Sequence, residues 1–189
     1  ARDRRLLVVG SSWTEDEAIL LPYFNEEAPE DFALVLAPHE IHEEHLRAIE
    51  SGLKRPSIRL SEYDEAKGLP EGTACIIIDC FGLLSSVYRY GRWAYVGGGF
   101  GKSVHNTLEA AVYGIPVFFG PEIHKHREVR ELVKRSSGFI LHDRAELSQL
   151  LQRFSSEEEC KALEARTRAY FREECGATAA ILSDILPSE

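Results

Sequence analysis

Short apolar segments alternate with helix-like segments along most of this 189-residue chain. The apolar segments resemble buried β-strands, and the segments between most of them have helical periodicity. This alternation predicts an α/β protein, with right-handed crossovers and a parallel sheet covered by helices on both faces. The expected strands are residues 6–9, 32–36, 57–60, 75–78, 93–96, 115–119 and 138–141. The expected helices are residues 14–24, 41–51, 83–90, 106–113, 125–134 and 144–154.

The end of the chain has a different pattern. A stripe at helical spacing runs from Cys160 to Glu174, and Gly176 interrupts it before the apolar residues 180–182. This predicts C-terminal amphipathic helices over roughly residues 156–186. No internal repeat, low-complexity segment or linker divides the sequence. We therefore expect one Rossmann-like domain over residues 1–189, with a parallel sheet of about six strands.

Composition argues against several classes of protein. The formal charge of −9, without any basic cluster, argues against a nucleic-acid partner. No apolar run reaches the length of a membrane span, and no signal peptide is evident, so we expect a cytoplasmic domain without a membrane span. The four cysteines lack the spacing of a metal or redox motif and are expected to be free and mostly buried.

A glycine-rich loop after one of the expected strands indicates an anion site. The adjacent glycines Gly97, Gly98 and Gly99 allow close approach of a ligand to the backbone, and the helix that follows would direct N–H groups at an anion. Lys102 and Ser103 match the end of a P-loop, but Val96 stands where that motif requires its first glycine. The dinucleotide pattern G-x-G-x-x-G fails as well. The spacing therefore leaves the kind of anion open.

Four loops are expected to meet at one edge of the sheet, because ligands bind at the carboxyl ends of parallel strands. They are residues 10–14, 38–40 and 79–82, together with the glycine loop. In the first, Thr14 and Glu17 have the spacing of a capping box. In the third, Asp79 suits a helix cap as well as a ligand contact.

Other polar and aromatic residues have simpler interpretations. His39, His42 and His45 lie at i, i+3 and i+6, which permits a metal clip but favours a solvated first turn of a helix, because no buried ligand set is evident. Trp13 and Trp93 are expected to be packing residues. The sequence thus predicts no metal site.

Taken in order, these motifs resemble the C-terminal half of 3-deoxy-D-manno-octulosonic acid (Kdo) transferases. The resemblance covers nearly the whole chain, and its most specific part is His-Asn-Thr-Leu-Glu-Ala-Ala at residues 105–111, followed by Gly-Ile-Pro-Val at 114–117 and Gly-Pro at 120–121. The supporting motifs are Gly-Ser-Ser at 10–12, Ala-Pro-His at 37–39 and Asp-Cys-Phe-Gly at 79–82.

The chain departs from this family at several positions. The family commonly has Arg where this chain has His39, and Asn is frequent where it has Lys125. Residues 79–83 read Asp-Cys-Phe-Gly-Leu rather than Asp-[Ser/Thr]-Met-Gly-Glu, and the loop before His105 is shorter. These differences concern individual cytosine and phosphate contacts more than the fold.

The resemblance implies one half of a GT-B glycosyltransferase, in which two Rossmann-like domains face each other across a cleft. It implies that this half binds CMP-Kdo or CMP, and that an N-terminal domain absent from this chain binds a lipid A precursor and supplies the carboxylate base. The reaction would be an inverting single displacement in the lipopolysaccharide biosynthesis of Gram-negative bacteria, without a metal or other cofactor. We expect the chain to be inactive alone, and the full-length protein to lie at the cytoplasmic face of the inner membrane.

The residues expected to bind the donor come from all four loops. Glu109 is placed to accept hydrogen bonds from ribose hydroxyls, although Asn106 and Glu109 also fit a capping box. His105 either contacts the phosphate or pairs with Glu109. Lys102 is a candidate to stabilise the leaving group, or a solvated lysine. The complete set is Ser11, Ser12, Pro38, His39, Asp79, Phe81, Gly82, Gly97, Gly98, Gly99, Ser103, His105, Asn106 and Glu109.

Two other functions remain compatible with the same layout. The chain could belong to a GT-B relative that uses a UDP-sugar, either an epimerase or another glycosyltransferase. It could also be a non-catalytic nucleotide-binding domain. Nucleotide preference separates the first alternative from a CMP-Kdo enzyme.

Overall fold

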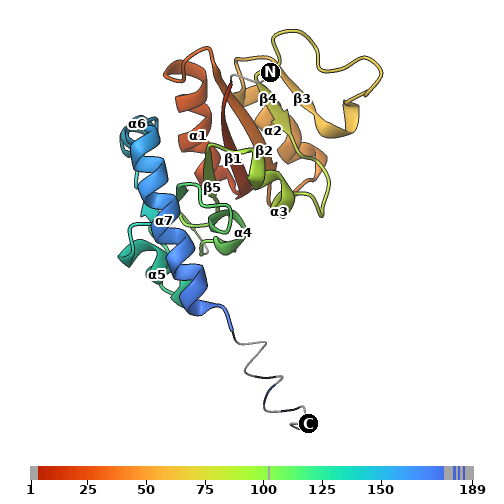
Figure 1. The fold of residues 1–189 in the computed structure, drawn as a ribbon. Helices are drawn as coiled ribbons and strands as arrows, with labels where there is room; N and C mark the ends of the chain where they lie inside the picture. The colour runs from red at the N-terminus through yellow and green to blue at the C-terminus, as the bar shows by residue number, and fades with distance from the viewer. Residues whose placement is uncertain (1–3, 102, 177–180, 182, 184, 186–189) are drawn as a thin grey trace.

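A parallel sheet of seven strands forms the centre of the computed structural model, which describes residues 4–101, 103–176, 181, 183 and 185 (Figure 1). The strand order is β3-β4-β2-β1-β5-β6-β7. The strands are β1 (Arg5–Ser12), β2 (Phe32–Pro38), β3 (Ser57–Arg59), β4 (Cys75–Ile77), β5 (Trp93–Val96), β6 (Val117–Phe119) and β7 (Gly138–Ile140). The predicted parallel sheet is confirmed, with seven strands rather than about six.

Seven helices are found among the described residues. They are α1 (Thr14–Glu26), α2 (Glu43–Gly52), α3 (Leu84–Val87), α4 (Leu108–Ala111), α5 (Arg127–Lys134), α6 (Arg144–Arg153) and α7 (Glu157–Glu174), and short 3₁₀ turns cover Leu60–Glu62 and Tyr88–Tyr90. The helix predicted over residues 106–113 is wrong in length. It is a single turn, and Gly114 follows it with a φ of +72°, a conformation that ends helices.

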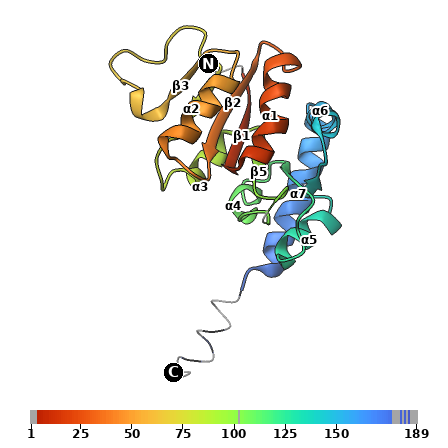
Figure 2. The ribbon, with the colours of Figure 1, turned by 180° about the vertical axis from the view of Figure 1, so that it is seen from behind.

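Helices cover both faces of the sheet. One face carries the side chains of α1, α2 and α6, and the other carries those of Tyr88, α4 and α5. Helix α7 buries residues of its predicted stripe, with Leu163 in the first of these cores and Tyr170 in the second. Both views of the ribbon show α7 beside α5 and α6 (Figures 1 and 2). The predicted helix after Gly176 falls mostly outside the described residues.

The order in which strands are added to the sheet changes direction at β1, between β2 and β5. From β1 the chain proceeds to β2 on one side, and it later returns to place β5 on the other side of β1. The carboxyl ends of two such strands flank a crevice in which α/β proteins bind ligands. Gly10 lies opposite Val96 there, and the Gly97 N–H donates to the Gly10 carbonyl oxygen at 2.9 Å. The glycine loop therefore starts beside the loop that follows β1.

Two other expectations can be compared with the structure. All four cysteines are free, but only Cys75 is buried, whereas Cys80 and Cys175 are exposed. The expectation of mostly buried thiols was therefore wrong. Across the described ranges, no helix combines the length and apolar character that crossing a bilayer requires.

Candidate functional site

Asp16 joins the first loop to the glycine loop. Its side chain is fully buried and accepts hydrogen bonds from the Trp13 N–H (2.9 Å), the Gly98 N–H (2.9 Å) and the Tyr95 hydroxyl (2.6 Å). Burial raises the pKa of the Asp16 carboxyl, and the three donors offset this effect only in part. The predicted capping box of Thr14 and Glu17 was wrong. The N-cap residue is Trp13, and the Asp16 carboxylate accepts a hydrogen bond from the Trp13 N–H.

The three adjacent glycines are required by the protein's own backbone. A Cβ atom at Gly97 would collide with the Ser11 carbonyl oxygen, and one at Gly98 with the Ser103 carbonyl oxygen. A Cβ atom at Gly99 would lie 2.7 Å from the Gly120 nitrogen. The groups that approach these glycines closely are therefore backbone atoms of the protein itself, because the loops after β1, β5 and β6 pack against one another there.

Several donors of the glycine loop remain available to a ligand. Within the part of the chain that the structure describes, the N–H groups of Gly99, Phe100, Asn106 and Thr107 have no hydrogen-bond acceptor. The hydroxyls of Ser103 and Thr107 are buried and have no partner among the described residues. Buried polar groups normally have partners, so the Ser103 and Thr107 hydroxyls indicate a position where an anion or water binds.

Three rings form a compact cluster at the mouth of these loops. The Trp13 Nε1–H donates to His105 Nε2 at 3.0 Å, and the planes of the two rings differ by only 11°. His39 stacks on both, with centroid distances of 4.4 Å to each. Trp13, which the sequence suggested as a packing residue, therefore stacks on two histidines, whereas Trp93 is buried as expected and donates to the Phe154 carbonyl oxygen.

Asn106 and Glu109 form a pair at the start of α4. The Asn106 Nδ2 group donates to Glu109 Oε1 at 2.9 Å, and Asn106 Oδ1 accepts from the Leu108 N–H at 3.1 Å. This is an amide–carboxylate contact and differs from the predicted capping box, in which Glu109 would bond the Asn106 backbone. The other Glu109 oxygen accepts no hydrogen bond from the described residues, which leaves it available to a hydroxyl donor.

The loops after β2 and β4 complete this edge. Pro38 is buried at the end of β2. Asp79 accepts hydrogen bonds from the Ser61 N–H at 3.0 Å and from the Ser61 hydroxyl, so it holds the loop after β3 instead of capping a helix. Phe81 is 79% exposed, and Gly82 has a φ of +89°. This loop therefore presents an aromatic ring to its surroundings.

A buried polar chain links the first loop to the second. The Ser12 hydroxyl donates to Glu17 Oε1 (2.8 Å), and Glu17 Oε2 lies 2.9 Å from His45 Nε2. His45 Nδ1 lies 2.9 Å from the Glu40 carbonyl oxygen. Since His45 is only 9% exposed, its assignment to a solvated first turn was wrong. Of the two serines predicted to bind the donor, Ser12 is part of this chain of hydrogen bonds. Ser11 lies at an irregularity in β1 and has a φ of +53°.

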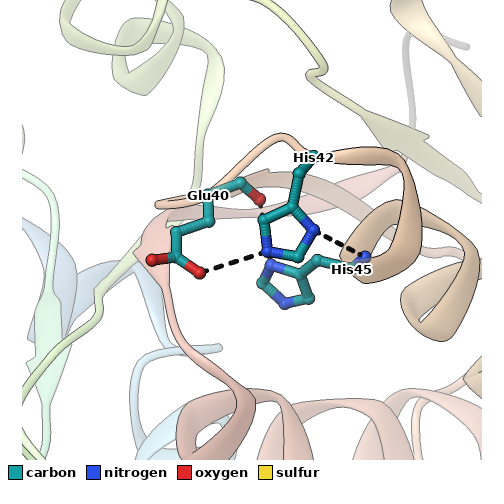
Figure 3. A group of neighbouring side chains, drawn as sticks. All are labelled: Glu40, His42 and His45. Carbon is teal, nitrogen blue, oxygen red and sulfur yellow. Dashed lines mark hydrogen bonds and ion pairs between the residues drawn. The ribbon is translucent and has the colours of Figure 1, made fainter.

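His42 caps the helix that carries His45. Its Nδ1 accepts from the His45 N–H at 3.2 Å, and its Nε2 lies 3.3 Å from Glu40 Oε2 (Figure 3). Helix α2 begins one residue later, at Glu43. His39 is not part of this group, because its ring stacks on Trp13 and His105.

The structure brings together residues from three of the four predicted loops, those after β1, β2 and β5, whereas Asp79 of the fourth contacts Ser61. Lys102 lies outside the described residues. Sequence reasoning missed four residues that shape the site: Asp16, Glu17, His45 and Tyr95. Three consecutive acidic residues lie in the first turn of α1, and of these the sequence analysis gave a structural role only to Glu17, in a capping box with Thr14. Tyr95 offered a signal for a buried polar contact, since a tyrosine hydroxyl inside a buried strand must find a hydrogen-bond partner.

Comparison with known proteins gives a consistent result. No protein-family model matches the chain. The chain is 32% identical to a 3-deoxy-D-manno-octulosonic acid transferase from Aquifex aeolicus over 163 residues, which is 84% of this chain and 44% of that protein. The chain therefore spans less than half the length of this curated relative.

Solved structures confirm the fold. The C-terminal CMP-Kdo binding domain of WaaA from Acinetobacter baumannii superposes with a TM-score of 0.76 at 20% identity, over 88% of this chain and 89% of that domain. WaaG, a glycosyltransferase involved in lipopolysaccharide biosynthesis, matches with a TM-score of 0.62 at 12% identity, over 100% of this chain and 48% of WaaG. The chain has the fold expected for one half of a GT-B glycosyltransferase.

Proposed function

The chain is homologous to 3-deoxy-D-manno-octulosonic acid transferases over 84% of its length, and from this we propose that it is the donor-binding half of such an enzyme. It would hold CMP-Kdo while Kdo passes to a lipid A precursor during lipopolysaccharide biosynthesis. The acceptor and the catalytic base would belong to a part of the protein that this chain does not include.

One observation carries the proposal beyond similarity. The orphan N–H groups of the glycine loop and the Asn106–Glu109 pair lie beside the crevice between β1 and β5, where α/β folds bind nucleotides. Backbone N–H groups suit a phosphate, and a carboxylate suits ribose hydroxyls. The exposed ring of Phe81 suits a stacked cytosine.

These groups define what the chain contributes to the transfer. The acceptor oxygen forms a bond to the anomeric carbon of Kdo as the bond from that carbon to the phosphate oxygen breaks, and CMP leaves with the electron pair. The acceptor proton passes to the base in the other half. The N–H groups of Gly99 and Phe100, with the Ser103 hydroxyl, would stabilise the charge that develops on the phosphate. Lys102 would add a positive charge, and we propose that no metal is needed for this step.

Calorimetric titration of the chain with CMP, UMP and ADP tests the proposal. We expect weak binding with a preference for CMP, and about tenfold weaker CMP binding by Glu109→Gln, which loses a charge-assisted hydrogen bond. Glu131→Gln is the matched control, because Glu131 lies on α5 in an exposed pair with Lys134. A preference for UMP would favour a UDP-sugar enzyme. The absence of any CMP preference would refute the proposal.

The acceptor and the cellular location follow from the same proposal. A lipid A precursor would approach from the part of the protein outside this chain, and the whole enzyme would act at the cytoplasmic face of the inner membrane. Separation of membranes from soluble extract, followed by detection of the full-length protein, tests the location.

A further inference from the structure

We infer that Glu40, His42 and His45 form a binding site for a zinc-like divalent cation, distinct from the proposed nucleotide site but linked to its first loop through Glu17. A carboxylate oxygen of Glu40 and one ring nitrogen of each histidine lie within 4.8 Å of one another. His42 Nε2 is 3.3 Å from Glu40 Oε2, which matches the roughly 3.3–3.5 Å between two ligands of one tetrahedral zinc ion. Figure 3 shows the three side chains turned toward one another.

His45 has the supporting contact typical of metal-binding histidines. Its Nε2 lies 2.9 Å from the buried carboxylate of Glu17, which also accepts from the Ser12 hydroxyl. A histidine that donates one N–H to a carboxylate presents the other nitrogen as a metal ligand. That nitrogen, Nδ1, points toward the Glu40 carbonyl oxygen at 2.9 Å.

This arrangement favours a cation at Nδ1 of His45. If Nε2 carries the proton toward Glu17, then Nδ1 and the Glu40 carbonyl oxygen are two acceptors in contact. Because neither acceptor can donate to the other, either a second proton on the ring or a metal ion must lie between or beside His45 Nδ1 and the Glu40 carbonyl oxygen. An ion there would also be reached by the Glu40 carboxylate and by His42, so one ion would satisfy every acceptor in the group.

The donor set selects the kind of ion. Two imidazole nitrogens and a carboxylate suit Zn²⁺ and the neighbouring transition metals, whereas Mg²⁺ and Ca²⁺ prefer oxygen ligands. Binding through His42 Nε2 shifts that ring's proton to Nδ1, which now accepts from the His45 N–H. Loss of this helix cap limits the affinity, and we therefore expect a dissociation constant in the micromolar range.

Zinc titration by calorimetry tests the inference on the 189-residue chain, in a background with Cys80→Ser and Cys175→Ser because both thiols are exposed. We expect one zinc per chain and no heat from MgCl₂. His42→Ala and Glu40→Gln should each weaken binding at least tenfold. His142→Ala is the matched control, because His142 also contacts a carboxylate, Glu146 at 3.0 Å, and should leave zinc binding unchanged.

Thermal unfolding provides a second readout that does not depend on heats of binding. Zinc should raise the Tm of the parent and of His142→Ala, and EDTA should reverse the shift. The Tm of His42→Ala without zinc shows whether that variant is folded, and Glu40→Gln serves if it is not. Zinc binding that is equal in the parent and both site variants, or no zinc binding, would overturn the inference.

Discussion

Gly98 adopts a backbone conformation that other residues avoid. Its φ is +91°, and a Cβ atom there would collide with the Ser103 carbonyl oxygen. We expect Gly98→Ala to lower the free energy of unfolding by about 1–3 kcal/mol, because the strain adds to the collision. Gly101→Ala is the control, since the nearest atom to a Cβ there is 3.7 Å away. Urea unfolding of both variants measures the difference, and equal losses would show that the loop adapts.

The buried carboxyl of Asp16 predicts a specific dependence of stability on pH. Burial raises its pKa, so the folded chain keeps this proton to a higher pH than the unfolded chain does. The resulting stabilisation is complete below about pH 4, the ordinary pKa of an aspartate, and is lost as the pH rises through the raised value. The unfolding free energy of the parent minus that of Asp16→Asn should therefore fall above about pH 4.

Asp31 provides a control of opposite sign for that measurement. Its hydrogen bonds with Arg5 lower the pKa of the Asp31 carboxyl, so its contribution is present above the ordinary pKa and lost as the pH falls. The unfolding free energy of the parent minus that of Asp31→Asn should therefore rise with pH. If the Asp16 difference also rises with pH, its three hydrogen-bond donors outweigh burial.

At the scale of elements, helix α7 packs into both hydrophobic cores of the sheet. Leu163 is fully buried against one face of the sheet, and Tyr170 packs against the other. Leu163→Ala should lower the unfolding free energy by about 2–5 kcal/mol, as expected for a cavity in a packed core. Lys161→Ala, at an exposed position of the same helix, should change it by less than about 0.5 kcal/mol. A small loss at Leu163 in thermal or urea unfolding would contradict a joint role for α7.

Strands could be predicted from the sequence more reliably than short helices. A strand buried on both faces is a nearly continuous apolar run, which is visible in β1 and β2 without knowledge of their neighbours. The length of α4 depends on the glycine loop and Gly114, whose geometry follows from contacts with other loops. Local periodicity therefore predicted a helix there but not its length.

The errors within the site have a related cause. One position along a helix turns a side chain by about 100°, so taking Thr14 rather than Trp13 as the N-cap residue exchanges the roles of Asp16 and Glu17, although the start of α1 itself was predicted correctly. Glu17 then faces His45, 28 positions away in the sequence, which local patterns do not place beside it. The sequence thus predicted that the loops after β1, β2 and β5 meet, but not the buried contacts that hold them.

At the scale of the whole molecule, the chain spans 44% of the length of its Aquifex relative. Because we place the base and the acceptor outside this chain, we expect it to transfer no Kdo when supplied with CMP-Kdo and a lipid A precursor. A longer protein that includes the acceptor-binding portion should do so. A radiolabelled transfer assay on both compares them, and turnover by the chain alone would place the base within these 189 residues.

The position of the two tryptophans has a practical consequence. Trp93 is enclosed in the core at 1% exposure, whereas Trp13 stacks on His39 and bonds His105 beside the crevice between β1 and β5. Ring contacts of this kind quench indole fluorescence, so a ligand that moves His39 or His105 changes the emission of Trp13 over a constant background from Trp93. The protein therefore contains its own optical reporter, and occupancy of the crevice can be followed in solution without a label.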